Sequence, residues 1–381
     1  MQGSRADGSH QGDGLCPSAP APMHHPMPAV FDDLDTLLNH GFDTVIDVRS
    51  PAEFAIDHIP GAINLPALDN VQRAKVGQVY KQISPFDARK IGAGMVIRNV
   101  ANHLDGPLSG KAGGWRPLIY CWRGGQRSGV FRTILSEVGW RAETIQGGYQ
   151  TFRRLVNAAV YDADLPHQLI LLDGNTGTAK TALLPRLGAC GVQVLDLEGL
   201  AQHRGSLLGE MDGGQPAQRG FETAIAVALR QLDPTRPVIV EAESSKIGKL
   251  TLPPSLWRAM LAAPRIVLHA PLRARAVYLA DAYHNLLAQT DQLAQRLAPL
   301  RRVRGHAAVD QWIQLSQSGA LIDLAQTLIE DHYDPAYAKS RRIDSRNVIA
   351  TVHIDRLDAQ GQDDAANTII ATLQQRSASS L

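Results

Sequence analysis

The stretch YCWRGGQRSG at residues 120–129 combines a cysteine, a glycine pair and two arginines. It follows the apolar run PLIY, which predicts a strand, and precedes SGVFRTILSEVG, which predicts a helix. Glycine allows backbone angles that other residues avoid, so successive amides of such a turn can point at the thiol of Cys121. These amides, together with Arg123 or Arg127, would stabilise a thiolate and bind an anion. The pattern fits a catalytic cysteine, and it also fits a small buried thiol in a strand-to-helix turn.

The spacing between the cysteine and the second arginine bears on the chemistry. Cys121 and Arg127 enclose five residues, and C-x5-R is the spacing of cysteine-dependent phosphatases, whose loop fits a tetrahedral phosphate. A phosphatase of that kind also needs a general acid. No aspartate in an equivalent place is identifiable in the sequence, so loop length by itself leaves phosphatase chemistry open.

A second loop, GNTGTAKT, has phosphate-binding chemistry and lies between the apolar run LILLD and a predicted helix. It matches the G-x4-G-K-[ST] pattern, in which backbone amides surround phosphate oxygens, Lys180 supplies a positive charge and the Thr181 hydroxyl can hold Mg²⁺. Ala179 stands where the pattern has glycine, and its methyl group is expected to narrow the loop. The residues expected to bind phosphate are Gly174, Asn175, Thr176, Gly177, Thr178, Ala179, Lys180 and Thr181.

Two acidic pairs come at the ends of apolar runs. Glu241 and Glu243 lie in VIVEAES, and Asp196 and Glu198 lie in VLDLE. Parallel sheets carry ligand and metal groups at the carboxyl ends of their strands, so Glu241 and Asp196 are the acidic candidates for Mg²⁺. The alternative is a solvated strand end or a structural ion pair. No structural metal site is expected.

Strands alternating with helices predict two α/β units with parallel sheets, which would position both loops. The segment from residue 69 to residue 114 carries helical periodicity and predicts an inserted helical segment. From about residue 275 the pattern predicts helices only. The expected divisions are a disordered extension rich in Gly, Ser, Pro and His at 1–28, units at 29–160 and 166–345, and a C-terminal segment at 346–381.

Charge and composition limit the class of protein. The formal net charge of +1 excludes a polybasic protein but not a local basic face. The odd set of three cysteines has no metal-ligand spacing, which indicates a reducing cytoplasm, and no apolar run is long enough for a membrane span. Two arginine-rich stretches, RLAPLRRVRGH and KSRRIDSR, fit either RNA phosphates or a solvated helix face. The candidate RNA-binding residues in them are Arg301, Arg302, Arg304, Arg341 and Arg342.

The stretch DVRSPAEFAIDHIPGAINLP at residues 47–66, together with the loop at Cys121, resembles the rhodanese homology domain. The resemblance implies a cysteine that carries a transferable chalcogen. His58 is expected to be a structural hydrogen-bonding residue rather than a base. Sulfur-transferring rhodaneses usually have a loop one residue shorter than the one here.

The resemblance to a known family extends over most of the chain: residues 30 to about 345 resemble the bacterial tRNA 2-selenouridine synthase family. That resemblance implies a rhodanese-like parallel-sheet domain followed by a P-loop NTPase-like α/β domain with a helical, basic C-terminal region. The stretches that carry it are VGQVYKQISPFDARKIGA, YCWRGGQRSG, QGGYQTFRR, GNTGTAKT, LDLEGLAQHRGSLLG, QPAQRGFE, VEAESSKIG and HYDPAY.

The resemblance implies an enzyme that replaces sulfur by selenium in the wobble 2-thiouridine of tRNA. Selenophosphate would be the selenium donor, and a geranyl group from geranyl diphosphate would first alkylate the sulfur. Cys121 would carry selenium as an S-selanyl adduct, with Arg123 and Arg127 binding selenophosphate. The P-loop would hold the diphosphate of the prenyl donor or a nucleotide, with Mg²⁺ as a possible companion. The implied partners are tRNA and an enzyme that supplies selenophosphate.

Three other readings remain open from the sequence. One is a rhodanese-type sulfurtransferase with a regulatory P-loop domain, and another is a C-x5-R phosphatase of the same layout. The third is an RNA-binding protein without catalysis, against which the intact loop at Cys121 argues. Trp122 fits stacking on the target base or a place in the core.

Overall fold

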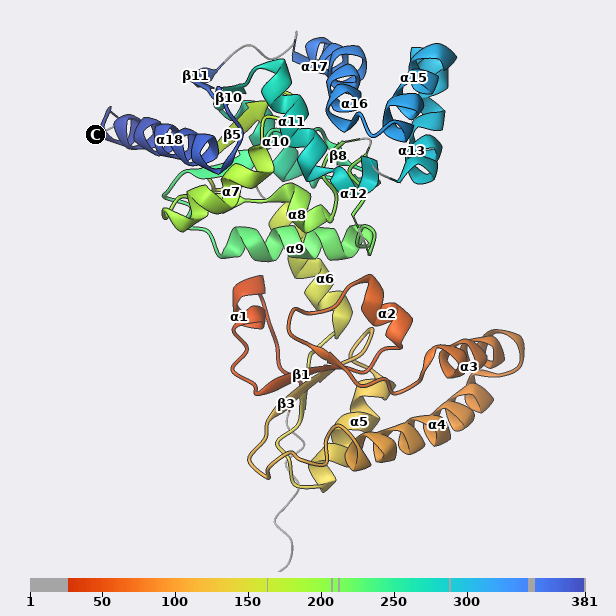
Figure 1. Cartoon of the computed structure of the whole chain (residues 1–381). Coiled ribbons are helices and arrows are strands. Elements are labelled where there is room, and N and C mark those ends of the chain that lie inside the picture. The colour runs from red at the N-terminus through yellow and green to blue at the C-terminus, as the bar shows by residue number, and fades with distance from the viewer. Residues whose placement is uncertain are drawn as a thin grey trace, which may run out of the picture.

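The computed structural model describes residues 27–162, 164–206, 208–211, 213–287, 289–341 and 347–379. All but the last two residues of the expected N-terminal extension lie outside this part of the chain. Two α/β units follow one another in the described part, as the alternation of strands and helices predicted (Figure 1). None of the described helices combines the length and the apolar composition that a membrane crossing requires.

The first unit is built on a four-stranded parallel sheet with the order β2-β1-β3-β4. Its central strands are fully or almost fully buried, which explains the unbroken apolar runs in the sequence. The strands are β1 (Thr44–Asp47), β2 (Ile63–Asn64), β3 (Pro117–Tyr120) and β4 (Glu143–Thr144). The flanking helices are α1 (Leu34–Leu38), α2 (Pro51–Ile56), α5 (Gln126–Glu137) and α6 (Tyr149–Asn157).

The inserted segment forms the helical hairpin of α3 (Asn70–Gln82) and α4 (Pro85–Asp105), which confirms the helical prediction for this stretch. Asp69 begins α3 through a capping box with Gln72. Ser84 caps α4, and the proline that follows it needs no hydrogen bond at the first helical position. Figure 1 shows the hairpin projecting from the first unit.

The second unit has a five-stranded parallel sheet with the order β11-β10-β5-β7-β6. Its strands are β5 (Leu169–Gly174), β6 (Gln193–Leu195), β7 (Val238–Glu241), β10 (Arg265–His269) and β11 (Val348–His353). A short hairpin, β8 (Lys246–Ile247) and β9 (Leu250–Thr251), follows β7. The helices of this unit are α7 (Lys180–Ala189), α8 (Leu197–Ala201), α9 (Gln218–Arg230), α10 (Pro254–Ala262), α11 (Leu272–Ala282) and α18 (Ala359–Ser379).

A helical lobe lies between α11 and β11. Its core gathers apolar side chains around the fully buried Trp312. The elements are α12 (His284–Leu287), α13 (Thr290–Leu297), η2 (Ala298–Leu300), α14 (Arg301–Arg304), α15 (His306–Gln317), α16 (Leu321–Leu328), η3 (Ile329–Tyr333) and α17 (Asp334–Arg341).

The C-terminal segment corrects two expectations. The prediction that strands end near residue 275 is wrong, because β11 pairs in parallel with β10 at the edge of the second sheet. Ile369 and Leu373 of α18 join the same buried cluster as Leu183 of α7, so residues 347–379 belong to the second unit rather than to a separate segment. As an edge strand with most side chains exposed or half-buried, β11 lacks the apolar run that marks a central strand.

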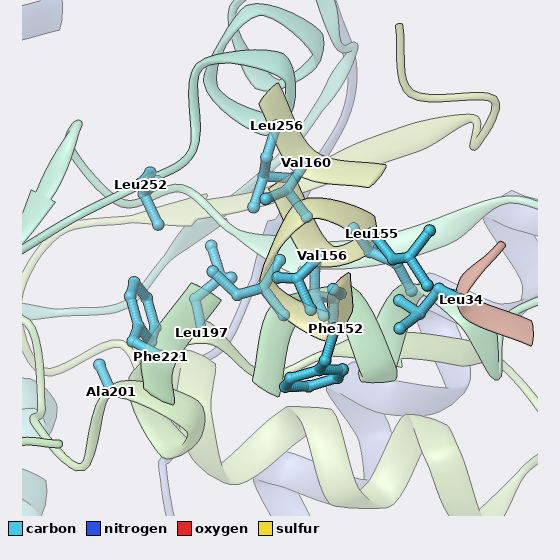
Figure 2. Packing of buried hydrophobic residues seen from close by; sticks show 14 of the residues in the cluster. Leu34, Phe152, Leu155, Val156, Val160, Leu197, Ala201, Phe221, Leu252 and Leu256 are labelled. Atoms are coloured by element: carbon cyan, nitrogen blue, oxygen red, sulfur yellow. The ribbon is translucent and has the colours of Figure 1, made fainter. Parts of the chain in front are cut away.

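The two units share one hydrophobic core. After α6 the chain continues as η1 (Ala158–Asp162), and this helical stretch carries Phe152, Val156 and Val160 into a cluster with residues of the second unit. Figure 2 shows these side chains packed beside Phe221 of α9 and Leu256 of α10. Apolar burial therefore joins the units, as it joins the halves of a single domain.

Candidate active sites

Cys121 directly follows β3 and lies at the floor of the first candidate site. Its side chain is only 4% exposed. The helix α5 begins at Gln126, with Gly125 as the N-cap, so the free amides of its first turn face the end of β3. The strand-to-helix arrangement predicted from the sequence is confirmed.

Two glycines make the loop possible. Gly124 has φ +64°, a left-handed conformation that strains residues with a Cβ atom. A Cβ atom on Gly148 would collide with the carbonyl of Cys121 and the amide of Gly124. The backbone that follows Gly148 fixes the start of the loop, because the Tyr149 amide donates a hydrogen bond to the Cys121 carbonyl at 2.8 Å.

Hydrogen bonds and charge tune the thiol. The Ser128 Oγ lies 3.2 Å from the Cys121 Sγ. Burial acts to raise the pKa of the Cys121 thiol, but the Ser128 hydroxyl, the backbone amides of Ser128 and Gly125 and the charge of Arg127 outweigh it. The pKa of Cys121 therefore lies below its ordinary value, which favours the reactive thiolate.

Arg127 is held by Glu53 from α2. The Arg127 Nη1 donates to the Glu53 Oε2 at 3.1 Å, and Arg73 of α3 lies 3.7 Å from the same oxygen. Burial acts to raise the pKa of Glu53, but the two arginines and a backbone hydrogen bond from Ser50 lower it below its ordinary value. Glu53 is thus ionised at neutral pH and fixes the direction of Arg127.

A cleft of about 1290 Å³ opens above Cys121 between the α3–α4 hairpin and α5. Its walls are mostly apolar, with Val76 and Tyr80 on one helix and Val96 and Ile97 on the other. The charged side chains that line it are all arginines, namely Arg73, Arg89, Arg123 and Arg127. The cleft suits an anion at its floor and an apolar or aromatic group along its walls.

Other residues of the rhodanese-like stretch are structural. The buried Arg49 forms an ion pair with Asp47 at 2.6 Å and lies 3.9 Å from the ring centre of Tyr149. The Nδ1 of His58 lies 2.9 Å from the Phe54 carbonyl, which is the kind of contact expected of a structural hydrogen-bonding residue. Trp122 is half-buried beside the Tyr149 ring and lines the cleft.

The second candidate site is the phosphate loop between β5 and α7. Lys180 opens α7, and its Nζ donates to the Gly174 carbonyl at 2.8 Å. Burial acts to lower the pKa of Lys180, but Tyr337, Glu243, Glu198 and Asp173 raise it above the ordinary value. The amine therefore stays charged beside the loop.

Ala179 occupies the position where the phosphate-loop pattern has glycine. It adopts φ +59°, a left-handed conformation, and its side chain is buried in the core cluster with Leu183. Alanine at this position carries a backbone strain of roughly 1–2 kcal/mol, and Ala179 lines the phosphate-loop pocket together with Lys180. Ala179 thus adopts the left-handed backbone conformation that glycine usually adopts.

The carboxylates at the loop differ from those expected. The Thr181 hydroxyl donates to the Glu198 Oε2 at 2.6 Å, and Glu243 lines the same pocket of about 340 Å³. Asp196 instead caps α8 by accepting from the Gly199 amide at 2.7 Å. Glu241 is fully buried and accepts from the Leu197 amide at 2.8 Å, away from the pocket lining.

Burial explains the protonation of the two glutamates on β7 and after it. Desolvation, with Asp196 and Glu198 nearby, raises the pKa of Glu241 well above its ordinary value. Desolvation and the Glu198 carboxylate raise the pKa of Glu243 to about 7. Glu243 and Glu198, rather than Glu241 and Asp196, are the carboxylates that face the pocket.

Three side chains from distant parts of the chain form a clamp on the phosphate loop that no motif in the sequence predicted. Asp334, in the HYDPAY stretch, accepts from the Asn175 side chain at 3.0 Å and from Arg275 at 2.7 Å. Arg275 in turn donates to the Thr176 carbonyl at 2.9 Å. Tyr337, one turn further along α17, lines the pocket. The only signal for this clamp in the sequence is the HYDPAY stretch itself.

The basic residues proposed for RNA have mixed environments. Arg301 pairs with Asp310 at 2.5 Å, and Arg304 donates to the His332 carbonyl at 3.0 Å, whereas Arg302 is exposed. The side chain of Arg341 and all of Arg342 lie outside the described residues. In the described part of the chain, no group of three or more His, Cys, Asp or Glu side chains has the geometry of a metal site.

Comparison with known proteins finds a matching family for each of the two units. The sequence pattern of the tRNA 2-selenouridine synthase AAA domain matches residues 167–365, and that of the rhodanese-like domain matches residues 30–155. The tRNA 2-selenouridine synthase of Hahella chejuensis is 32% identical over 330 residues, which are 77% of this chain and 84% of that protein. The enzyme of the same name from Nitrosomonas europaea is 36% identical over 276 residues, 71% of each chain. Among solved structures, a rhodanese-related protein from Thermoplasma volcanium aligns with a TM-score of 0.21 at 20% identity, over 32% of this chain and 85% of that one.

Proposed function

The chain belongs to the tRNA 2-selenouridine synthase family, and from this premise we propose that it replaces sulfur by selenium in the wobble 2-thiouridine of tRNA. Selenophosphate is the selenium donor. The observation that carries the proposal is the loop of Cys121, where a thiol of lowered pKa lies at the floor of a cleft whose charged lining is four arginines. This site suits a small anion that carries selenium, with the target base and Trp122 above it.

The phosphate loop is proposed to bind geranyl diphosphate. Lys180 is charged and faces the loop, and Arg204 lines the same pocket. Tyr278, Leu279 and Tyr283 also line this pocket, and their largely apolar side chains suit an apolar chain. Saturable binding of ATP with tRNA-stimulated hydrolysis would instead favour a nucleotide at this loop.

The residues at the loop also fit Mg²⁺. The Thr181 hydroxyl and the carboxylates of Glu198 and Glu243 offer the hard oxygen ligands that this ion prefers. Bound there, the ion would neutralise diphosphate oxygens and make diphosphate a better leaving group.

The two sites are proposed to carry out two successive steps, alkylation of the sulfur and its replacement by selenium. A thiocarbonyl sulfur is a poor leaving group, and alkylation by the geranyl group breaks the C–O bond of the donor, releases diphosphate and activates C2 of the base. Selenium then replaces geranylthiol at C2. The arginines Arg123 and Arg127 are proposed to hold selenophosphate while Cys121 reacts with it. A tRNA substrate would place the protein in the cytoplasm, together with an enzyme that supplies selenophosphate.

Analysis of modified nucleosides by mass spectrometry tests the proposal. A 2-thiouridine tRNA is incubated with the full-length protein, geranyl diphosphate and selenophosphate. We expect 2-selenouridine from the wild type, the S-geranylated base from Cys121→Ser and unchanged 2-thiouridine from Lys180→Ala. Unchanged 2-thiouridine with the wild type would refute the proposal.

The alternative activities are measured with the same protein. Thiosulfate-to-cyanide transfer at a rate comparable to tRNA modification would favour a sulfurtransferase. Turnover of a phosphate monoester at such a rate would favour a phosphatase.

A further inference from the structure

We propose that Cys121 attacks the phosphorus atom of selenophosphate, forms S-phosphocysteine and releases selenide beside the activated base. The inference rests on the proposed function and specifies the step at Cys121. It differs from the S-selanyl adduct that the rhodanese resemblance implies, in which the thiol takes the selenium atom itself.

Loop size is the first observation. Cys121 and Arg127 enclose five residues, one more than in sulfur-transferring rhodaneses. A shorter loop suits a single chalcogen atom on the cysteine, whereas this spacing suits the three oxygens of a phosphoryl group. The amides of the first turn of α5 and the arginine fork are the donors that such oxygens need.

Ser128 supplies the second observation. Its hydroxyl lies 3.2 Å from the Cys121 Sγ and is itself fully buried. A hydroxyl at this place stabilises the thiolate when it attacks, and again when it leaves a phosphorylated cysteine. The hydroxyl also lies 3.2 Å from the Gly125 carbonyl, so its single proton can pass from that carbonyl to sulfur when the thiolate forms.

The third observation is the direction of Arg127. Glu53, which Arg127 and Arg73 keep ionised, accepts from the Arg127 Nη1 at 3.1 Å. Glu53 is therefore a positioning residue that holds the guanidinium at the rim of the loop. Because its pKa is lowered, it is unsuited to act as a proton donor to a leaving group.

Selenide, as the leaving group, does not require a general acid to protonate it. Hydrogen selenide is a far stronger acid than an alcohol or a phenol, so selenide leaves phosphorus without protonation. Among the described residues that line the cleft, none is an aspartate or a glutamate. The missing general acid, which argues against an ordinary phosphatase, is compatible with cleavage of a P–Se bond.

The step balances without an added oxidant or reductant. The Cys121 sulfur forms a bond to phosphorus, the P–Se bond breaks, and selenide leaves with the electron pair. Selenide then attacks C2 of the S-geranylated base and expels geranylthiolate. Water attacks phosphorus, releases phosphate and restores the Cys121 thiolate. Attack on selenium would instead release the reduced species phosphite and would leave a Se–S bond that a reductant must cleave.

Rapid-quench mass spectrometry of the intact, full-length protein tests the inference. Phosphoryl and selenium adducts have almost the same mass, so the donor is selenophosphate labelled with oxygen-18 on phosphorus. We expect an adduct on Cys121 that carries the oxygen label and lacks the isotope pattern of selenium. An adduct with the selenium pattern and no oxygen label would overturn the inference.

Substitution of the hydroxyl provides a second readout. Ser128→Ala should form the labelled adduct several-fold more slowly than the wild type, because less of the Cys121 thiol is ionised at neutral pH. Ser136→Ala, which changes an exposed hydroxyl on the same helix, should form it at the wild-type rate, and Cys121→Ser should form no cysteine adduct. Formation of 2-selenouridine with no phosphoryl adduct in either the wild type or Ser128→Ala would also overturn the inference.

Failure of the inference is distinguishable from failure of the proposed function. The same reactions contain S-geranylated tRNA, and its nucleosides are analysed in parallel. If the wild type yields 2-selenouridine while the adduct lacks the oxygen label, only the inference at Cys121 fails. If no 2-selenouridine forms, the proposed function itself fails, and the inference with it.

Discussion

At the scale of single residues, the surroundings of Cys121 and Glu243 shift the pKa values of their side chains away from the ordinary values. Cys121 and Glu243 are both largely buried, yet their pKa values move in opposite directions. The thiol has donors and a positive charge beside it, whereas Glu243 has a second carboxylate beside it. Two predictions follow from these environments.

Replacement of Ser128 by alanine should make Cys121 less reactive at neutral pH. The substitution removes the hydroxyl that lowers the thiol pKa, so the thiolate fraction falls. The rate of alkylation by iodoacetamide should then follow a pH profile shifted to higher pH. An unshifted profile, with Ser136→Ala as the matched control, would contradict the assigned role of Ser128.

Replacement of Glu243 by glutamine should stabilise the protein at alkaline pH. The folded-state pKa of about 7 lies above the ordinary value of 4.5, so ionisation favours the unfolded state as pH rises between these values. In the wild type, ionisation of the buried Glu243 lowers the free energy of unfolding by its full amount above the folded-state pKa. Below the pKa of the unfolded state it has no effect. Glu243→Gln should therefore raise the free energy of unfolding by on the order of 3 kcal/mol at high pH and by little at low pH.

Urea unfolding at acidic and at mildly alkaline pH measures this difference. Glu137→Gln, an exposed glutamate on α5, is the control and should show no such pH dependence. Equal effects of Glu243→Gln at both pH values would mean that the carboxyl is not protonated near neutrality.

At the scale of elements, the phosphate loop is positioned by a helix that comes far later in the chain. Asp334, at the start of α17, joins Asn175 of the loop to Arg275 of α11. Arg275 is only 5% exposed, and Asp334 supplies the opposite charge that a buried guanidinium requires. The helical lobe therefore supports the loop that it follows in sequence.

Substitution of Asp334 by alanine should weaken ligand binding at the phosphate loop. Loss of the charged hydrogen bonds, worth about 1.5–3 kcal/mol each when partly buried, leaves Arg275 unpaired and the loop less fixed. We expect at least a tenfold loss of affinity for a non-reactive geranyl diphosphate analogue by calorimetry, with alkylation of Cys121 unchanged. Asp323→Ala removes an exposed ion pair with Arg273 and should leave the affinity unaltered.

At the scale of the whole molecule, the two units fold around a common core. Phe152 and Val156 of α6 are fully buried against residues of the second unit, and Arg153 forms an ion pair with Glu222 of α9. The Tyr161 hydroxyl donates to the same glutamate at 2.6 Å. The units therefore support one another rather than being joined by a free linker.

Phe221→Ala should destabilise both units together. Truncation of a fully buried phenylalanine costs about 3–5 kcal/mol. Hydrogen exchange should show faster opening in β3 of the first unit as well as in β7 of the second. Val277→Ala, which alters an exposed side chain on α11, is the control. Faster exchange confined to the second unit would show that the units unfold separately.

The sequence by itself determined the local features of this protein. Cys121 with its glycines and Arg127, the phosphate loop from Gly174 to Thr181, and the α3–α4 hairpin are each encoded within a short stretch. Turn residues, capping residues and apolar periodicity act over a few positions, so they can be read without knowledge of the fold. The alternation of strands and helices indicated two parallel sheets for the same reason.

Only the tertiary structure decided which side chains meet. Glu198 and Glu243, and not Asp196 and Glu241, face the phosphate loop, because helix capping and burial engage the other two. The clamp of Asp334 and the pairing of β11 with β10 join residues that are far apart in the chain. Such contacts depend on how elements pack in space, and local sequence patterns carry little information about packing.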